Sequence, residues 1–267
     1  MPSRPLGSIF WAASIQRSVG FGIVTGVTTL VRRRAPHPVT VTAVADLTPR
    51  MRRITVAGTT LLGLVVTPAQ DVELILADDG GHQLKRRYTI RSARPELGEF
   101  DIDALRHEHG PGGRWAARVA VGDRLELLGP RGRLEVRDAD WHLFLGDEAA
   151  LPAIAALVEA IPPTQPAIVL AEVAGAADEL PIVRADGQLD LRWLHRDGHR
   201  VGSSDLFVRA LTTLVPTWPS GSPQAYVLGE SRAVIALRPV LERRGIAPDR
   251  MFIKGYWNLG RGGRAAG

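Results

Sequence analysis

The hexapeptide RRYTIR at residues 86–91 carries side chains suited to holding a flat, phosphorylated heterocycle. Strand alternation places Arg86, Tyr88 and Ile90 on one face and the other three residues on the opposite face. A tyrosine ring can stack on a heterocycle, a threonine can hydrogen-bond its edge, and an arginine can bind phosphate through two parallel bonds. A basic edge strand with one aromatic residue is the alternative interpretation.

A second segment, HEHGPGGRWA, runs from His107 to Ala116. Its glycines and proline indicate a tight turn, and a helix is expected to begin at Gly113 or Arg114 and to run through Val119. Backbone N–H groups at a helix start attract pyrophosphate, so the turn is a candidate phosphate site. An ordinary strand-to-helix connection is the alternative.

The chain has no cysteine, which excludes disulfides, cysteine-ligated iron–sulfur clusters, thiol catalysis and cysteine-based zinc sites. His107 and His109 have a spacing that occurs in metal sites, but they lie in a glycine-rich turn. We disfavour a metal there, and equally at His195 and His199. If the protein transfers electrons, an organic cofactor must carry them.

Two further loops follow strands in the second half of the chain. They are GDEAALP from Gly146 to Pro152 and LGES from Leu228 to Ser231. Ligands of open α/β sheets bind at the carboxyl ends of strands, although well-capped helices would give the same pattern. The G-x-G-x-x-G fingerprint and the Walker A loop are absent, which disfavours a conventional Rossmann site. Near the C-terminus, Tyr256 and Trp257 follow a strand and suit either cofactor contact or core packing.

The elements that must position these residues change character halfway along the chain. The first half predicts a small antiparallel barrel of six short strands, at Val39–Ala45, Met51–Val56, Val72–Ala77, Tyr88–Arg91, Glu99–Leu105 and Arg124–Leu128.

The second half alternates strands with helices, which predicts a parallel sheet. The expected strands are Trp141–Leu145, Ala167–Val173, Leu191–His195, Ala225–Leu228 and Met251–Lys254. The expected helices are Glu148–Ile161, one from Ser203 or Ser204 to about Leu214, and Glu230–Arg244. We therefore expect a tail over residues 1–37, a barrel domain over 38–138 and an α/β domain over 139–267, with the seam near Arg137–Asp140.

The charge of the chain is concentrated in the tail. Of 267 residues, 45% are hydrophobic and 23% charged, which is typical of a globular protein, and the net charge is +5. Five arginines precede the first acidic residue, Asp46, so the body is neutral and nucleic-acid binding is disfavoured. The apolar stretch Ser18–Val31 is shorter than a membrane span, so we expect it to dock on the domain, with an interfacial membrane contact as the alternative. We expect a cytoplasmic protein.

Five segments, in order, resemble the siderophore-interacting protein family, which comprises FAD-dependent ferric-chelate reductases of the ferredoxin–NADP reductase superfamily. They cover the chain from about Pro38 to Gly260 and read RRYTIR, FDIDALRHEHGPGGRWAARVAVGDRLELLGPRG, LGDEAALPAI, LGESRAVIALRPVLERRG and KGYWNLGR.

The resemblance implies a FAD-binding barrel, an NADH- or NADPH-binding α/β domain and a role for each candidate residue. Tyr88 and Thr89 would face the flavin ring, and Arg86 the FAD phosphates. The remaining FAD contacts would come from Asp103, Leu105, His107, Gly110, Pro111, Gly112, Gly113 and Trp115. The nicotinamide side would comprise Gly146, Asp147, Glu148, Ala149, Gly229 and Glu230, with Tyr256 and Trp257 closing the cleft. Catalytic roles would fall to Tyr88, Thr89 and Glu230.

At four positions the chain departs from the usual family pattern. Glu108 replaces a glycine, Gly113 a serine or threonine, Ala150 a threonine, and Asn258 an arginine.

The resemblance implies reduction of a ferric siderophore or other ferric chelate by a monomer or weak dimer. Basic residues at the mouth of the cleft, with Arg52, Arg53 and Lys254 as candidates, would attract an anionic chelate. Two alternatives remain: a diaphorase-like reductase with another electron acceptor, and a non-catalytic binding protein with an arginine-rich docking tail. Glu172 would suit a ribose hydroxyl and favour NADH, whereas Arg184 or Arg196 could meet the 2′-phosphate of NADPH.

Overall fold

The computed structural model describes residues 35–77, 81–108, 110–184, 187–199, 201–214 and 218–260. The tail up to residue 34, its apolar stretch, residues 78–80 of an expected turn, and His109 lie outside these ranges. Docking or membrane contact by the tail therefore stays a prediction. Within the described ranges, no helix is both long and apolar enough to cross a membrane.

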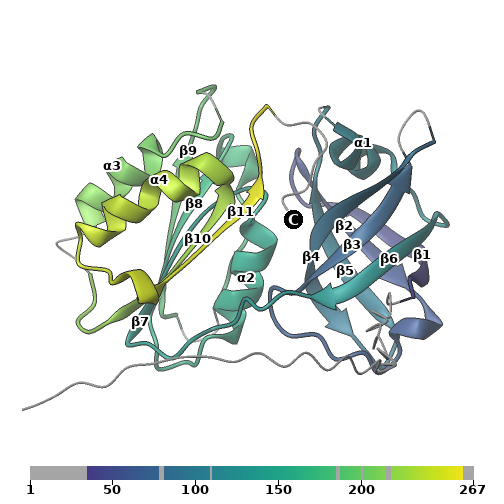
Figure 1. Ribbon diagram of the computed structural model, residues 1–267, viewed down its shortest axis with the longest axis horizontal. Helices are drawn as coiled ribbons and strands as arrows, with labels where there is room; N and C mark the ends of the chain where they lie inside the picture. The colour runs from purple at the N-terminus through teal and green to yellow at the C-terminus, as the bar shows by residue number, and fades with distance from the viewer. Residues whose placement is uncertain are drawn as a thin grey trace, which may run out of the picture. The chain divides into compact units, whose positions relative to one another are not determined.

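The first half of the described chain is a closed antiparallel barrel, as expected (Figure 1). The strands follow the order β1-β2-β5-β4-β3-β6 around it. They are β1 (His37–Asp46), β2 (Met51–Ala57), β3 (Asp71–Ala77), β4 (Gln83–Arg94), β5 (Glu99–Leu105) and β6 (Arg124–Arg131), with a 3-10 turn at Thr59–Leu61.

The barrel core is filled by alternating strand residues and covered at one end by a helix. Ile54, Phe100 and Ile102 are fully buried in it. Helix α1 (Gly110–Arg118) adds Ala116, and Val119 follows just behind the helix. The helix starts at Gly110 rather than at the expected Gly113 or Arg114, so the glycine-rich segment is the first turn of the helix and not a turn that precedes it.

The second half forms a five-stranded parallel sheet with the order β11-β10-β7-β8-β9. Its elements are β7 (Trp141–Asp147), α2 (Leu151–Ala160), β8 (Ala167–Val173), β9 (Leu189–His195), α3 (Asp205–Leu214), β10 (Pro223–Glu230), α4 (Ser231–Glu242) and β11 (Met251–Trp257), with 3-10 turns at Ala176–Asp178 and Pro248–Arg250. The alternation of strands and helices therefore led to the right architecture.

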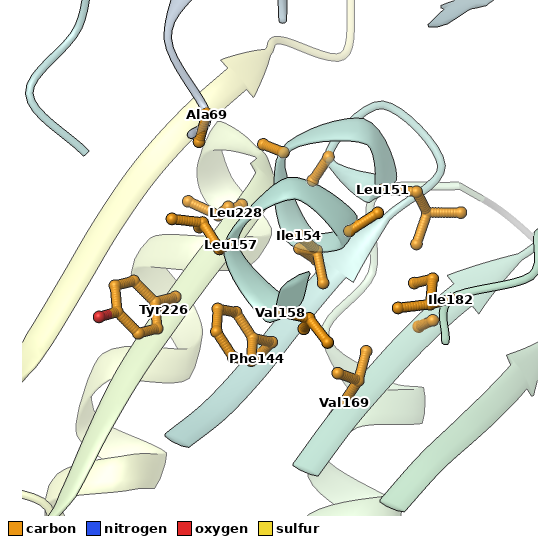
Figure 2. Close-up of a cluster of buried hydrophobic side chains, with 14 of the residues drawn as sticks. Ala69, Phe144, Leu151, Ile154, Leu157, Val158, Val169, Ile182, Tyr226 and Leu228 are labelled. Atoms are coloured by element: carbon orange, nitrogen blue, oxygen red, sulfur yellow. The ribbon is translucent and has the colours of Figure 1, made fainter. Parts of the chain in front are cut away.

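Helices cover both faces of this sheet, which explains why β7 and β8 are buried throughout. Helices α3 and α4 pack on one face, against Leu143 and Leu145 of β7. Helix α2 packs on the other, where Figure 2 shows its Ile154 and Val158 beside Phe144.

The barrel and the sheet share one hydrophobic cluster and belong to one compact unit. Met51, Ala69 and Leu134, all from the barrel half, join the cluster around α2 (Figure 2 labels Ala69). Arg91 of β4 also forms an ion pair with Glu159 of α2. Because these contacts are apolar and ionic together, they fix α2 against the wall of the barrel.

Some element bounds differ from the sequence expectation for identifiable reasons. Strand β4 is much longer than Tyr88–Arg91, because its first part pairs with β3 and its last part with β5, with a register shift between Ile90 and Ser92. Strand β11 extends to Trp257, so both aromatic residues lie within the strand rather than after it. Helix α2 begins at Leu151 instead of Glu148, because a turn closes from Ala150 N–H to the Asp147 carbonyl.

Candidate active site

One face of β4 carries Tyr88 beneath helix α1. Ile90 is buried in the barrel core, and Tyr88 packs against the same core. The Tyr88 hydroxyl donates to the Gly112 carbonyl over 3.1 Å, and its ring lies 5.2 Å from that of Trp115 at an angle of 52°. Burial raises the pKa of Tyr88, while Arg86 opposes the rise, so the phenol stays protonated as a hydrogen-bond donor.

The first turn of α1 depends on two glycines. A Cβ at Gly112 would lie 2.9 Å from the Tyr88 hydroxyl and 3.5 Å from Cγ of Arg86. A Cβ at Gly113 would collide with the carbonyl and ring of His107. Serine or threonine, the usual family residues at Gly113, would therefore not fit this local geometry.

This helix start has the properties of an anion site. Its first turn contains no acidic residue, and its leading N–H groups carry partial positive charge. The Arg86 side chain runs alongside Gly112, and Glu108 is exposed to solvent. The indole N–H of Trp115 is buried without a hydrogen-bond partner among the described residues. A glycine cradle, a helix N-terminus, an arginine and an unpaired donor together fit a dinucleotide such as FAD.

The opposite face of β4 looks toward β11. Thr89 is 6% exposed and lies beside the Tyr256 hydroxyl. Burial raises the pKa of Tyr256, and Thr89 opposes the rise. Two motifs that are far apart in the sequence therefore come together, and each brings an aromatic or hydroxyl group that can contact a planar ring.

A charged cluster that the sequence reading did not single out lies next to this contact. Asp71 of β3 accepts two hydrogen bonds from Arg87, at 2.9 and 2.6 Å, and one from Lys254 of β11 at 3.4 Å. The Lys254 ammonium also lies 5.0 Å from the centre of the Tyr256 ring. Burial lowers the pKa of Lys254, and Asp71 opposes that shift. The cluster joins the barrel to the sheet beside Thr89.

Asp103 and Leu105 occupy β5, where the predicted FAD contacts continue. The Asp103 carboxylate is 6% exposed and accepts bonds of 2.7 and 2.8 Å from Arg53. This ion pair raises the pKa of Arg53. Leu105 packs against the cluster around α2. Asp103 is thus already paired, while His107 is exposed ahead of α1.

The β7–α2 turn is built around the buried carboxylate of Asp147. It accepts hydrogen bonds from Trp257 Nε1 at 2.7 Å and from the backbone N–H of Glu230 and Ala149 at 2.9 and 3.0 Å. Burial raises its pKa to about 6, a rise that the Trp257 bond opposes. Gly146, the residue before Asp147, allows Ile154 of α2 to approach β7 closely, because a Cβ at Gly146 would lie 2.5 Å from Ile154 Cδ1. Asp147 therefore ties strands β7, β10 and β11 together at their carboxyl ends.

Gly229 and Glu230 complete this edge of the sheet. Gly229 has φ +146°, and a Cβ there would lie 2.7 Å from the Asp147 carboxylate. The Glu230 carboxylate accepts from the N–H groups of Arg232, Ala233 and Leu259, at 2.7, 2.9 and 3.0 Å. Both oxygens of Glu230 are engaged, so the geometry supports a positioning role for this residue.

A buried ionic triad lies at the neighbouring strand ends. Arg196 donates to Glu148 at 2.8 and 2.5 Å and to Glu172 at 3.1 Å. All three side chains are almost completely buried. Burial raises the pKa of Glu172 to about 7, although Arg196 opposes the rise. A small cavity beside the triad is lined by residues that include Asp147, Glu172, Gly202, Ser203, Gly229 and Glu230.

Metal binding has no support in the described ranges. No three histidine, aspartate or glutamate side chains there are grouped to hold an ion. His195 contacts Glu179 at 2.7 Å, and His142 contacts Gln165 at 2.7 Å.

The fold and the site together define a two-domain arrangement in which a barrel that can hold one dinucleotide lies against a parallel sheet that can hold another. Residues 77–134 match the siderophore-interacting FAD-binding domain, and residues 139–260 match the siderophore-interacting protein family.

Relatives agree with these matches. A siderophore utilization protein from T. fusca superposes with a TM-score of 0.79 at 32% identity, covering 86% of this chain and 95% of that one. The siderophore-interacting protein SipS from Aeromonas hydrophila gives 0.73 at 25% identity, covering 85% and 92%. The ferric vibriobactin reductase ViuB of Vibrio cholerae is 35% identical over 179 residues, 66% of this chain and 65% of ViuB. The chain belongs to the siderophore-interacting protein family, and its barrel is an FAD-binding domain.

Proposed function

We propose that this protein reduces a ferric siderophore or similar ferric chelate, with FAD as its cofactor and NADH or NADPH as the electron donor. Family membership and the activity named for ViuB support the reaction. The structural observation that carries it is the contact of Lys254 on β11 with Asp71 of the barrel at 3.4 Å, next to the Tyr256 ring. A ring held on β4 and a ring held at the carboxyl edge of the sheet would meet beside this contact.

The residues that would hold FAD are those that already surround the start of α1. Arg86 and the first-turn N–H groups would bind the phosphates, while Tyr88 and Thr89 would contact the flavin ring. Bound there, FAD would supply the chemistry of hydride acceptance from the nicotinamide and of single-electron transfer to ferric iron. The Tyr88 ring is held in place by its bond to Gly112 and by Trp115, so its orientation is set before the cofactor arrives.

On the sheet, Asp147 and Glu230 position the walls of the nicotinamide site rather than react. Asp147 holds the Trp257 indole, and Glu230 fixes the start of α4. Both carboxylates are buried.

Ferric iron needs no ligand from the protein in this reaction. Siderophore oxygens are hard ligands that hold Fe(III) strongly and Fe(II) weakly, so reduction releases the metal. Among the three basic residues considered for attracting an anionic chelate, Arg52 is bonded to Asp46 and to carbonyls at the end of α1, and Arg53 to Asp103. Lys254 is also paired, with Asp71, and is the one of the three that contacts an aromatic residue of the proposed site, Tyr256.

Spectroscopy and an iron-release assay test the proposal. The purified protein should show a flavin spectrum after incubation with FAD. With NADH or NADPH and a ferric siderophore it should form Fe(II), captured by a ferrous chelator. Cytochrome c and free flavin, run as alternative acceptors, should turn over more slowly. A protein that binds no flavin and forms no Fe(II) with FAD present would refute the proposal.

A further inference from the structure

The choice between NADH and NADPH depends on what meets the adenosine ribose. In dinucleotide-binding α/β sheets the pyrophosphate lies at the first strand-to-helix turn, and the adenosine ribose lies by the end of the neighbouring strand. Here that turn is β7–α2, and the neighbouring strand ends are those of β8 and β9. Glu172 and Arg196 lie at these two ends.

Arg196 is already fully used by the protein. Its guanidinium serves two buried carboxylates, Glu148 and Glu172, and its side chain is 4% exposed. Moving it toward a ligand phosphate would leave two carboxylates buried without a partner, which is strongly unfavourable. Arg50, the more exposed cation nearby, also contacts Glu148, at 3.5 Å.

Arg184 lies at the wrong edge of the sheet. It donates to the carbonyls of Gln165 and Pro162, at 2.8 and 3.1 Å, in the loop before β8. The seven residues of β8 place this loop about 20 Å from the carboxyl end of the strand. Of the two arginines considered for a 2′-phosphate, Arg184 is therefore at the opposite edge of the sheet, and Arg196 is at the ligand edge but held by Glu148 and Glu172.

Two acidic groups described at this edge are Glu148 and Asp197. Glu148 also accepts from the backbone N–H of Ala174, so that donor is occupied. Asp197 is exposed just after β9, and its carboxylate lies 3.8 Å from where a Cβ of Gly175 would stand. An exposed carboxylate can accept a hydrogen bond from a ribose hydroxyl, but it repels a phosphate.

We infer that the triad of Glu148, Glu172 and Arg196, together with Asp197, makes this protein select NADH and reject NADPH. The inference rests on the proposed use of a nicotinamide donor. In this inference the triad determines cofactor specificity, because its ion pair with Glu172 keeps Arg196 from binding the 2′-phosphate of the ligand.

Binding measurements without turnover test the inference. Calorimetric titration of the FAD-loaded protein with ADP-ribose and with 2′-phospho-ADP-ribose should show at least tenfold weaker binding of the phosphorylated ligand. Equal or tighter binding of the phosphorylated ligand overturns the inference. That result overturns the inference even if the protein reduces ferric chelates. Conversely, a protein that reduces no ferric chelate would refute the proposed function, but the measured ratio of the two affinities would still test the inference.

Two variants and a control locate the cause. At pH 8, where Glu172 is ionised, Glu172→Gln should reduce the ratio of the two dissociation constants at least threefold, because Arg196 loses one of its two anionic partners. Arg196→Gln should weaken both ligands by a similar factor, whereas a selective loss of the phosphorylated ligand would identify Arg196 as its binding residue and overturn the inference. Arg184→Gln, at the opposite edge, should leave the ratio unchanged. Circular dichroism would verify folding, and the wild-type ratio decides the question if a variant does not fold.

Discussion

Tyr88 connects the barrel core, helix α1 and the proposed flavin site through one side chain. Its ring packs on hydrophobic core residues, while its hydroxyl reaches Gly112. The position of the ring therefore depends on packing more than on the single hydrogen bond.

Replacing Tyr88 separates the ring from the hydroxyl. Tyr88→Ala should weaken FAD binding roughly tenfold, because an aromatic contact contributes about 1 kcal/mol beyond its buried area. Tyr88→Phe keeps the ring and should bind FAD within about threefold of the wild type, since a hydrogen bond between neutral groups contributes little net free energy. Flavin fluorescence titration measures both affinities. Equal affinities of the alanine variant and the wild type would contradict a flavin contact.

Glu172 should make the free energy of unfolding depend on pH. Its pKa is raised to about 7 from an ordinary value of 4.5, so between these values the folded state binds more protons than the unfolded state. Stability from this group is therefore fully present below pH 4.5 and lost as the pH rises to about 7.

Glu172→Gln removes this titration. The unfolding free energy of the variant minus that of the wild type should be more positive at pH 8 than at pH 5, by an amount on the order of 2 kcal/mol. Urea titrations at both pH values measure it, and Glu99→Gln, at the start of β5 in the barrel, is the control. A difference that stays constant with pH would mean that the glutamate keeps its ordinary pKa in the folded protein.

At the scale of elements, α4 begins where Glu230 accepts from two backbone N–H groups. Glu230→Ala should cost about 1–2 kcal/mol of unfolding free energy, as loss of an N-terminal cap does. Glu242→Ala is a matched control at the other end of α4, because it breaks only the exposed pair with Arg238 and should cost under about 0.5 kcal/mol. Chemical denaturation compares the two, and similar losses would exclude a capping role.

Strand and helix types were predictable because alternation and apolar runs are local signals. The alternation of RRYTIR correctly placed Tyr88 and Ile90 on one face, and the barrel and parallel sheet followed from element order. The register shift that lets β4 pair with two strands was not predictable, since it depends on partners distant in sequence. Strand order in the sheet was equally inaccessible.

The same limit applies to the candidate site. The sequence singled out Tyr88, Thr89 and Tyr256 by residue type. It did not reveal that Asp71 pairs with Lys254, because these residues are 183 positions apart. Nor did it reveal that Arg196 serves two glutamates, which only burial at the strand ends makes apparent.

At the scale of the whole molecule, the hydrophobic cluster around α2, which the barrel and the sheet share, couples the unfolding of the two halves. We expect one cooperative thermal transition by calorimetry, because Met51, Ala69 and Leu134 pack with α2. Ala69→Asp should lower the melting temperature of both halves together, since it buries a charge at their contact. Leu97→Asp, at a site 59% exposed in the barrel, should change it little. Two resolved transitions in the wild type would indicate independent domains.

The hydrogen bond from Leu259 to Glu230 has a practical consequence for expression of shortened forms. A cut before Leu259 removes this backbone donor from the buried Glu230 carboxylate, and a buried oxygen that loses its donor costs free energy. Versions trimmed to Trp257 should therefore give lower yields of intact protein than versions that continue to Gly260. Affinity tags and fusion partners are better attached beyond that glycine.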